Sequence, residues 1–112
     1  MPGAKIISVN SIQRLKVRLD EEKNKLVVVR FFDRDTDTIN GDRKAYDGLA
    51  EAYQNQSGVA FMEIEKSDIK SEDFEIRDVP AFWFYKGGVE IKDSRLEVPR
   101  MSSIRAKIDR LK

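Results

Sequence analysis

Two apolar runs stand out in the sequence, and both predict buried strands. The first covers residues 25–32, where valines and phenylalanines follow one another and Arg30 interrupts them. The second covers residues 59–64. A nearly continuous apolar run bounded by polar residues is typical of a strand that is covered on both faces.

The segment between these runs has the spacing of a helix. Its apolar residues recur at intervals of three and four, at Tyr46, Leu49, Ala50 and Tyr53. Asp42 is suited to cap the start of this helix, and residues 57–58, a serine and a glycine, to end it. A strand, a helix and a second strand in this order predict a right-handed crossover and two parallel strands.

The segment before the first run predicts one more strand and one more helix. Residues 6–9 are apolar enough for a short strand, and either Asn10 or Ser11 can cap the helix that follows. The buried face of that helix would hold Ile12, Leu15 and Leu19.

After the second run, residues 67–74 predict a short helix, and residues 81–85 with 89–91 predict a hairpin around two glycines. A closing helix follows Pro99, with its apolar face at Met101, Ile104, Ile108 and Leu111. The predicted order β-α-β-α-β-α-β-β-α corresponds to an α/β fold, a mixed five-stranded sheet with helices on both faces.

The amino-acid composition limits the kinds of catalytic and metal sites that the chain can form. The chain has 112 residues, 40% hydrophobic and 37% charged, which predicts one domain over residues 1–112. It has no cysteine and no histidine. Disulfide frameworks, cysteine or histidine zinc sites and Ser-His-Asp or Cys-His triads are therefore excluded.

Charge indicates no nucleic-acid partner, because the net charge is only +1. Residues 63–78 sum to about −4 and residues 100–112 to about +4, which we interpret as solvated helix faces. No apolar run approaches the roughly 18 residues of a membrane span, and the first residues lack a signal-peptide pattern. We therefore expect a cytoplasmic protein that does not bind membranes.

Four segments together resemble the thioredoxin family. They are residues 25–32, 49–53, 74–81 and 84–88, and their spacings match thioredoxin without a gap. The resemblance implies a thioredoxin-like fold in which Pro80 is the family's cis-proline. It also implies that Val79 offers its backbone groups to an extended peptide.

The family's catalytic residues are missing. Its Cys-X-X-Cys motif falls on Thr36, Asp37, Thr38 and Ile39, and its preceding tryptophan on Asp35. Thiol-disulfide exchange needs a thiolate and a second sulfur, which threonine and isoleucine cannot supply. The resemblance therefore implies a thioredoxin-like protein without redox activity.

Other family positions are changed as well. The buried aspartate of the family matches Arg30, its lysine neighbour matches Phe61, and the glycine beside the cis-proline matches Leu96. A buried guanidinium needs a carboxylate, backbone carbonyls or an aromatic face. We expect Arg30 to pack its stem and to direct its head toward the loop that follows the strand. Leu96 would offer an apolar contact to a ligand or close the groove.

Two other sites are conceivable. Asp33, Asp35 and Asp37 alternate like the first ligands of a calcium loop, although Thr38 and Lys44 stand where glycine and glutamate are needed. A calcium-dependent shift in melting temperature would reveal such a regulatory metal site. Residues 82–85 are all aromatic, as in a nucleic-acid stacking platform, but their alternation predicts core packing on both sides of the sheet.

The sequence thus predicts an interaction or adaptor module with no cofactor and no enzymatic activity. Its binding surface would comprise Asp35, Thr36, Asp37, Thr38, Ile39, Val79, Pro80 and Leu96. Because residues 33–42 sum to about −3, a protein partner of this surface would be basic. The alternatives are a divalent-metal regulatory site in the same loop and a non-redox enzyme that would use only carboxylates, lysine, arginine and hydroxyls, for which no pair of acids here forms a recognisable motif. If the groove does not bind, we expect the interaction on the exposed face of the last helix, at Arg105 and Lys107.

Overall fold

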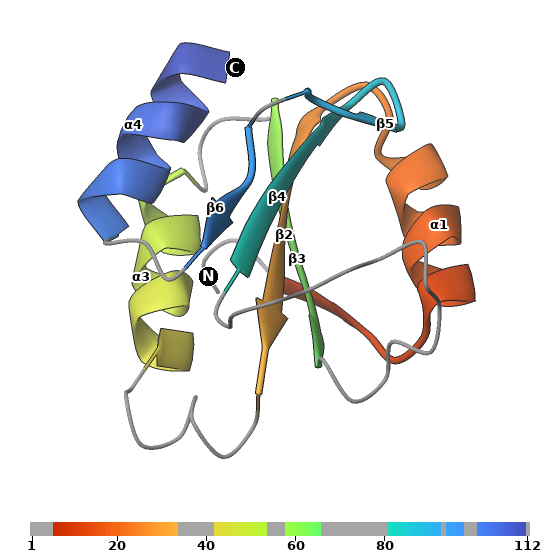
Figure 1. The fold of residues 1–112 in the computed structure, drawn as a ribbon, viewed down its shortest axis with the longest axis horizontal. Helices are drawn as coiled ribbons and strands as arrows, with labels where there is room; N and C mark the ends of the chain where they lie inside the picture. The colour runs from red at the N-terminus through yellow and green to blue at the C-terminus, as the bar shows by residue number, and fades with distance from the viewer. Residues whose placement is uncertain are drawn as a thin grey trace.

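The computed structural model describes residues 6–33, 42–53, 58–65, 81–92, 94–97 and 101–111. The elements in chain order are β1 (Ile6–Val9), α1 (Ile12–Glu21), β2 (Leu26–Phe32), α3 (Asp42–Ala52), β3 (Val59–Glu65), β4 (Ala81–Lys86), β5 (Val89–Glu90), β6 (Leu96–Glu97) and α4 (Met101–Leu111) (Figure 1). The helix predicted over residues 67–74 lies outside the described residues.

The strands form one mixed sheet in the order β1-β3-β2-β4-β5. Strands β1 and β2 are parallel to β3, and β4 runs antiparallel to β2. The crossover from β2 through α3 to β3 therefore gives the parallel pair that the sequence predicts. Strand β6 was not predicted: its two residues pair with the beginning of β4, Leu96 with Phe82 and Glu97 with Ala81.

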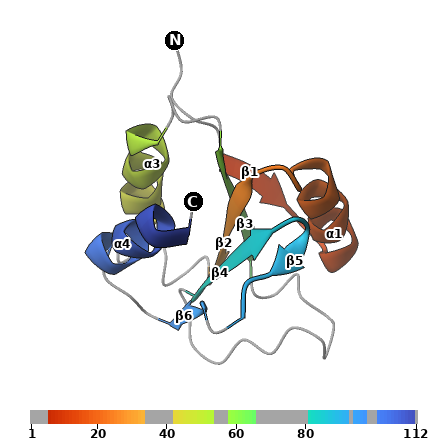
Figure 2. The same cartoon turned by 90° about the horizontal axis from the view of Figure 1, so that it is seen from above.

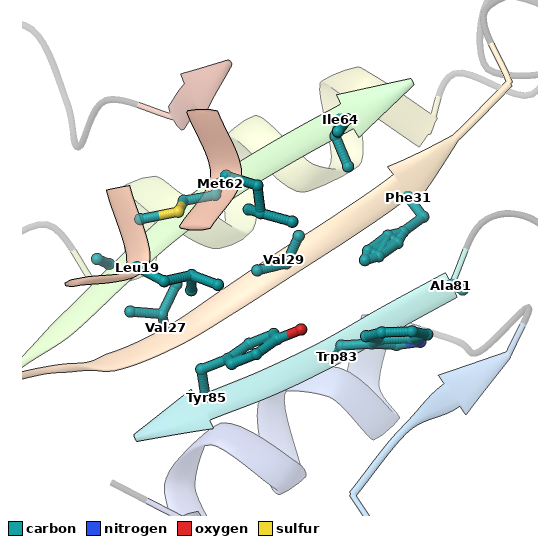
Figure 3. Packing of buried hydrophobic residues seen from close by; sticks show 11 residues of the cluster. Leu19, Val27, Val29, Phe31, Met62, Ile64, Ala81, Trp83 and Tyr85 are labelled. Atoms are coloured by element: carbon teal, nitrogen blue, oxygen red, sulfur yellow. The ribbon is translucent and has the colours of Figure 1, made fainter. Parts of the chain in front are cut away.

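Helices cover both faces of the sheet, with α1 on one face and α3 and α4 on the other (Figure 2). Alternate residues of β2 and β4 divide between these faces. The α1 side holds, among others, Val27, Val29, Phe31, Trp83 and Tyr85 (Figure 3), and the α3/α4 side holds Leu26, Val28, Phe82, Phe84 and Ile104. The two predicted apolar runs are thus explained by burial on both faces.

Local sequence explains where two elements end. Ser11 caps α1, since its side chain accepts a hydrogen bond from the Arg14 backbone N–H at 3.2 Å. Gly87 and Gly88 have φ angles of 67° and 79°, a left-handed conformation that glycine adopts readily. The Gly87 N–H also donates to the Lys23 carbonyl at 3.1 Å, which ties the β4–β5 hairpin to the end of α1.

The interpretation of residues 63–78 as a solvated helix face is wrong at its beginning. Residues 63–65 belong to β3, and Glu63 is only 2% exposed. The interpretation was based on the summed charge of the segment alone and did not consider that Glu63 lies within the apolar run of β3. On α4, the predicted apolar face is confirmed by the complete burial of Ile104 and Ile108.

No helix among the described residues is both long enough and apolar enough to span a membrane.

Candidate functional site

The candidate binding surface lies where β2 ends. Asp33, the first residue after β2, is exposed. Residues Asp35 to Ile39, Val79 and Pro80 are outside the described residues, so the cis-proline and the predicted surface stay predictions. The structure describes the neighbouring residues: the end of β2, which precedes Asp35 to Ile39 in the chain, and the start of β4, which follows Pro80 and pairs with β6.

A row of polar side chains crosses the sheet just before β2 ends. Arg30 of β2, Glu63 of β3 and Ser8 of β1 are register partners on neighbouring strands. Arg30 Nη2 lies 2.8 Å from Glu63 Oε1, and Ser8 Oγ donates to Glu63 Oε2 at 2.8 Å. Arg30 is 0% exposed, so this is an ion pair inside the core.

Aromatic rings surround the guanidinium. Arg30 Cζ lies 4.5 Å from the centroid of the Phe32 ring and 5.2 Å from that of Tyr46, within the range of cation–π attraction. The Tyr46 hydroxyl in turn donates to the backbone carbonyls of Val28 and Met62, at 3.0 and 2.9 Å. This joins α3 to both central strands, β2 and β3.

The sequence predicted that Arg30 needs a carboxylate or an aromatic face, and the structure supplies both. The sequence did not predict which carboxylate this is: the head was expected to point toward the loop after β2, and the described ion pair is with Glu63 of the neighbouring strand. Two parallel strands in register place residues 30 and 63 side by side. Glu63 interrupts the second apolar run as Arg30 interrupts the first, and that coincidence was the available clue.

The charged position in β2 is held by a fixed ion pair. An arginine stays protonated at every pH at which the protein is folded, so Arg30 cannot give or take a proton during a reaction. Its positive charge is compensated by Glu63 at 2.8 Å. Through Glu63 and Ser8 this pair links the three strands β2, β3 and β1, and Arg30 adds no acid–base capacity.

Leu96 takes part in the core as well as bordering the region. It is partly buried, pairs with Phe82 across β6 and β4, and packs against the cluster on the α3/α4 side. The strand pairing thus places Leu96 next to the first residues of β4, which follow Val79 and Pro80 in the chain.

The metal hypothesis receives no support from the part of the chain that is described. No group of three or more aspartate, glutamate, histidine or cysteine side chains there could hold a metal ion. Asp33 is the described member of the proposed triad, while Asp35 and Asp37 lie outside the described residues.

The aromatic residues of β4 are core residues, as predicted. Phe82 and Phe84 are 0% exposed on the α3/α4 side, and Trp83 and Tyr85 are 3% and 6% exposed on the α1 side. Burial raises the pKa of the Tyr85 phenol far above its ordinary value, with the Glu90 carboxylate as a second cause. A stacking platform for bases would need exposed rings, so these residues do not form one.

The second predicted surface, on α4, is exposed at Arg105 and half-buried at Lys107. Its inner side is fixed to α3 through Tyr53, whose hydroxyl donates to Asp109 Oδ1 at 2.6 Å. Burial and this carboxylate raise the pKa of Tyr53 to about 12. Asp109, an exposed acidic residue of α4, is therefore held by Tyr53, which directly follows the last residue of α3.

Comparison with known proteins bears on the fold. No protein-family model and no curated protein matches the sequence. Among solved structures, the thioredoxin of Fasciola hepatica has a TM-score of 0.81 at 21% identity, with 96% of this chain and 100% of that chain covered. The thioredoxin of Schistosoma mansoni has a TM-score of 0.74 at 22% identity, with 98% and 100% covered.

The chain has the thioredoxin fold. A designed protein is similar to the same degree, with a TM-score of 0.77 at 22% identity over 95% of this chain and 96% of that chain. Because the 112 residues contain no cysteine, this thioredoxin fold has no thiol with which to exchange disulfides. The fold and the missing thiols together fit a redox-inactive module.

Proposed function

We propose that this chain is an interaction module that binds a basic protein segment. The surface would comprise Asp35 to Ile39 after β2, Val79 and Pro80 before β4, and Leu96 in β6. Open α/β sheets bind ligands beyond the carboxyl ends of their strands, which is where these residues are expected. The binding would involve no cofactor and no chemical step.

The observation that carries this proposal is the buried Arg30–Glu63 pair. A thioredoxin fold that had only lost its cysteines would keep the rest of its proton-handling apparatus or fill the space with apolar side chains. Here the central position holds an ion pair at 2.8 Å, extended by Ser8 and framed by two rings. An ion pair that links three strands, and whose arginine cannot transfer a proton, supports a proposal of binding without chemistry.

The predicted charge of the surface indicates its partner. Asp33 is exposed at the end of β2, and residues 33–42 carry a net charge of about −3. Exposed charges of this kind attract a basic segment and are screened by salt beyond about 10 Å at 0.1 M.

A capture experiment with matched variants tests the proposal. The immobilised protein is exposed to an extract of its native source, next to an Asp35→Asn/Asp37→Asn variant and an Arg105→Ala/Lys107→Ala variant. We expect the partner to be lost from the first variant and retained by the second, with the thermal unfolding of both close to wild type. Retention by the first and loss from the second would place binding on α4 and refute the proposal.

A further inference from the structure

The single tryptophan of the chain lies beneath an arginine. Trp83 in β4 is 3% exposed, and Phe31 packs against it with 4.6 Å between the ring centroids and an angle of 61°. Figure 3 shows the two rings side by side on adjacent strands. Arg95 lies over the indole, with Cζ 3.6 Å from the ring centroid.

The same guanidinium is held by a carboxylate. Arg95 Nε and Nη2 lie 2.5 and 2.8 Å from the two oxygens of Glu90, a bidentate ion pair. Glu90 in β5 is the register partner of Tyr85, which shares the α1-side face of β4 with Trp83. An aromatic face and a carboxylate with both oxygens available are together complementary to a flat guanidinium.

Arg95 is the part of this arrangement that faces solvent. Its side chain is 45% exposed and that of Glu90 is 25% exposed, whereas Trp83 beneath them belongs to the core. Ion pairs and cation–π contacts at exposed positions are individually weak. Arg95 is thus the most exposed of the three side chains, and a guanidinium that reached the indole face beside the Glu90 carboxylate from outside would have to displace it.

We propose that Trp83 and Glu90 form a recognition site for an arginine side chain of a partner protein, filled by Arg95 of the same chain until the partner binds. Because the site now holds the guanidinium of Arg95, we infer that the group it would accept from a partner is also a guanidinium. This inference deepens the proposed function, since it specifies arginine within a basic partner. The arginine site is made of residues outside the 35–39 loop. Trp83 pairs with Val29, which precedes Asp33 by four residues.

Chemical rescue of an emptied site tests the inference. Arg95→Ser removes the guanidinium and leaves Trp83 as the only fluorescent indole. The probe is N-acetylarginine amide, with the uncharged N-acetylcitrulline amide as its isosteric counterpart. We expect the arginine probe to restore the wild-type tryptophan emission of the variant in a saturable manner, at a concentration at least tenfold below that needed with citrulline.

Three further proteins complete the experiment. The wild type should respond at least tenfold more weakly than Arg95→Ser, because Arg95 competes. Lys92→Ser removes the same charge from an exposed position of the same connection and should behave as wild type. In Glu90→Gln/Arg95→Ser the saturable response should disappear. Arg95→Gln, which is also uncharged, replaces Arg95→Ser if the latter does not fold.

Equal responses to arginine and citrulline, or equal responses of wild type and Arg95→Ser, would overturn the inference. The loop variant Asp35→Asn/Asp37→Asn separates it from the proposed function, because that variant should leave this titration unchanged. If the loop variant still captures the partner and its titration with the arginine probe is unchanged, the arginine site is retained and the loop is rejected as the binding surface.

Discussion

At the scale of single residues, Arg30 and Glu63 depend on each other. Each is almost completely buried, and the 2.8 Å ion pair compensates the charge of each with that of the other. Transfer of two charges into a core is costly, so such a pair is typically no more stabilising than well-packed apolar residues, whereas one member left alone is strongly destabilising.

We therefore expect Glu63→Gln to lower the free energy of unfolding by about 3–5 kcal/mol, since it leaves the Arg30 guanidinium buried without its carboxylate. The double variant Arg30→Met/Glu63→Leu should be closer to wild type than either single variant. Ser8→Ala is the matched control, because it removes one hydrogen bond to the same carboxylate and should cost only about 1 kcal/mol. Urea unfolding of these proteins decides this, with the single variants Arg30→Met and Glu63→Leu measured beside the double variant. Additive losses in the double variant would contradict the coupling.

At the scale of elements, most of the sheet was predictable and its edges were not. Strands β2 and β3 and the crossover between them follow from two apolar runs and one helical spacing, which are properties of the local sequence. Strand β6 has two residues and exists only because β4 offers them a partner. The ion pair of Glu63 was missed for a related reason, because it depends on the register between strands.

The proposed binding surface was predicted only from the resemblance to thioredoxins, through the positions that match the family's active-site residues. Thr36 to Ile39 follow from where the family's cysteines fall, whereas the contact of Arg95 with Trp83 has no pattern in the sequence that would reveal it. Residue 95 is twelve positions after residue 83, and the turn of β5 is what returns it to the ring. A contact between side chains that only the fold brings together can be identified only once the structure is known.

The junction of α3 and α4 leads to a prediction about pH. The folded state raises the pKa of Tyr53 from 10.0 to about 12, so above pH 10 the unfolded chain releases a proton that the folded chain keeps. The stability from this group is complete below pH 10 and is lost as pH rises through about 12. Tyr53→Phe should cost about 1 kcal/mol at pH 7, since it removes the hydrogen bond to Asp109.

The difference between wild type and Tyr53→Phe should then shrink as pH rises from 9 toward 12. Urea unfolding of both proteins at intervals across this range measures it. Because both contain the same lysines and arginines, the titration of those groups cancels in the comparison. A difference that stays constant with pH would show that Tyr53 does not titrate differently in the two states.

At the scale of the whole molecule, a thioredoxin fold is present without the chemistry that the fold is able to support. The sheet order, the parallel and antiparallel pairs and the helices on both faces are retained, whereas no residue of the chain carries a thiol. Fold and activity are thus separate properties here, and the site residues decide the second.

We expect no dithiol-dependent reduction of insulin by the purified protein. The reason is that disulfide exchange proceeds through a mixed disulfide, which a chain without cysteine cannot form. The assay follows insulin precipitation beside an active thioredoxin at equal concentration. A rate above that of buffer, surviving repeated purification, would contradict this expectation.

The central claim is that the former active-site region binds a basic protein segment. The most direct measurement is an NMR titration of the isotope-labelled protein with a basic peptide from the captured partner, at low and at high salt. The account predicts amide shift changes at residues 35–39, Val79 and Leu96 that weaken as salt increases. Changes confined to α4 around Arg105 and Lys107, with residues 35–39 unaffected, would contradict it.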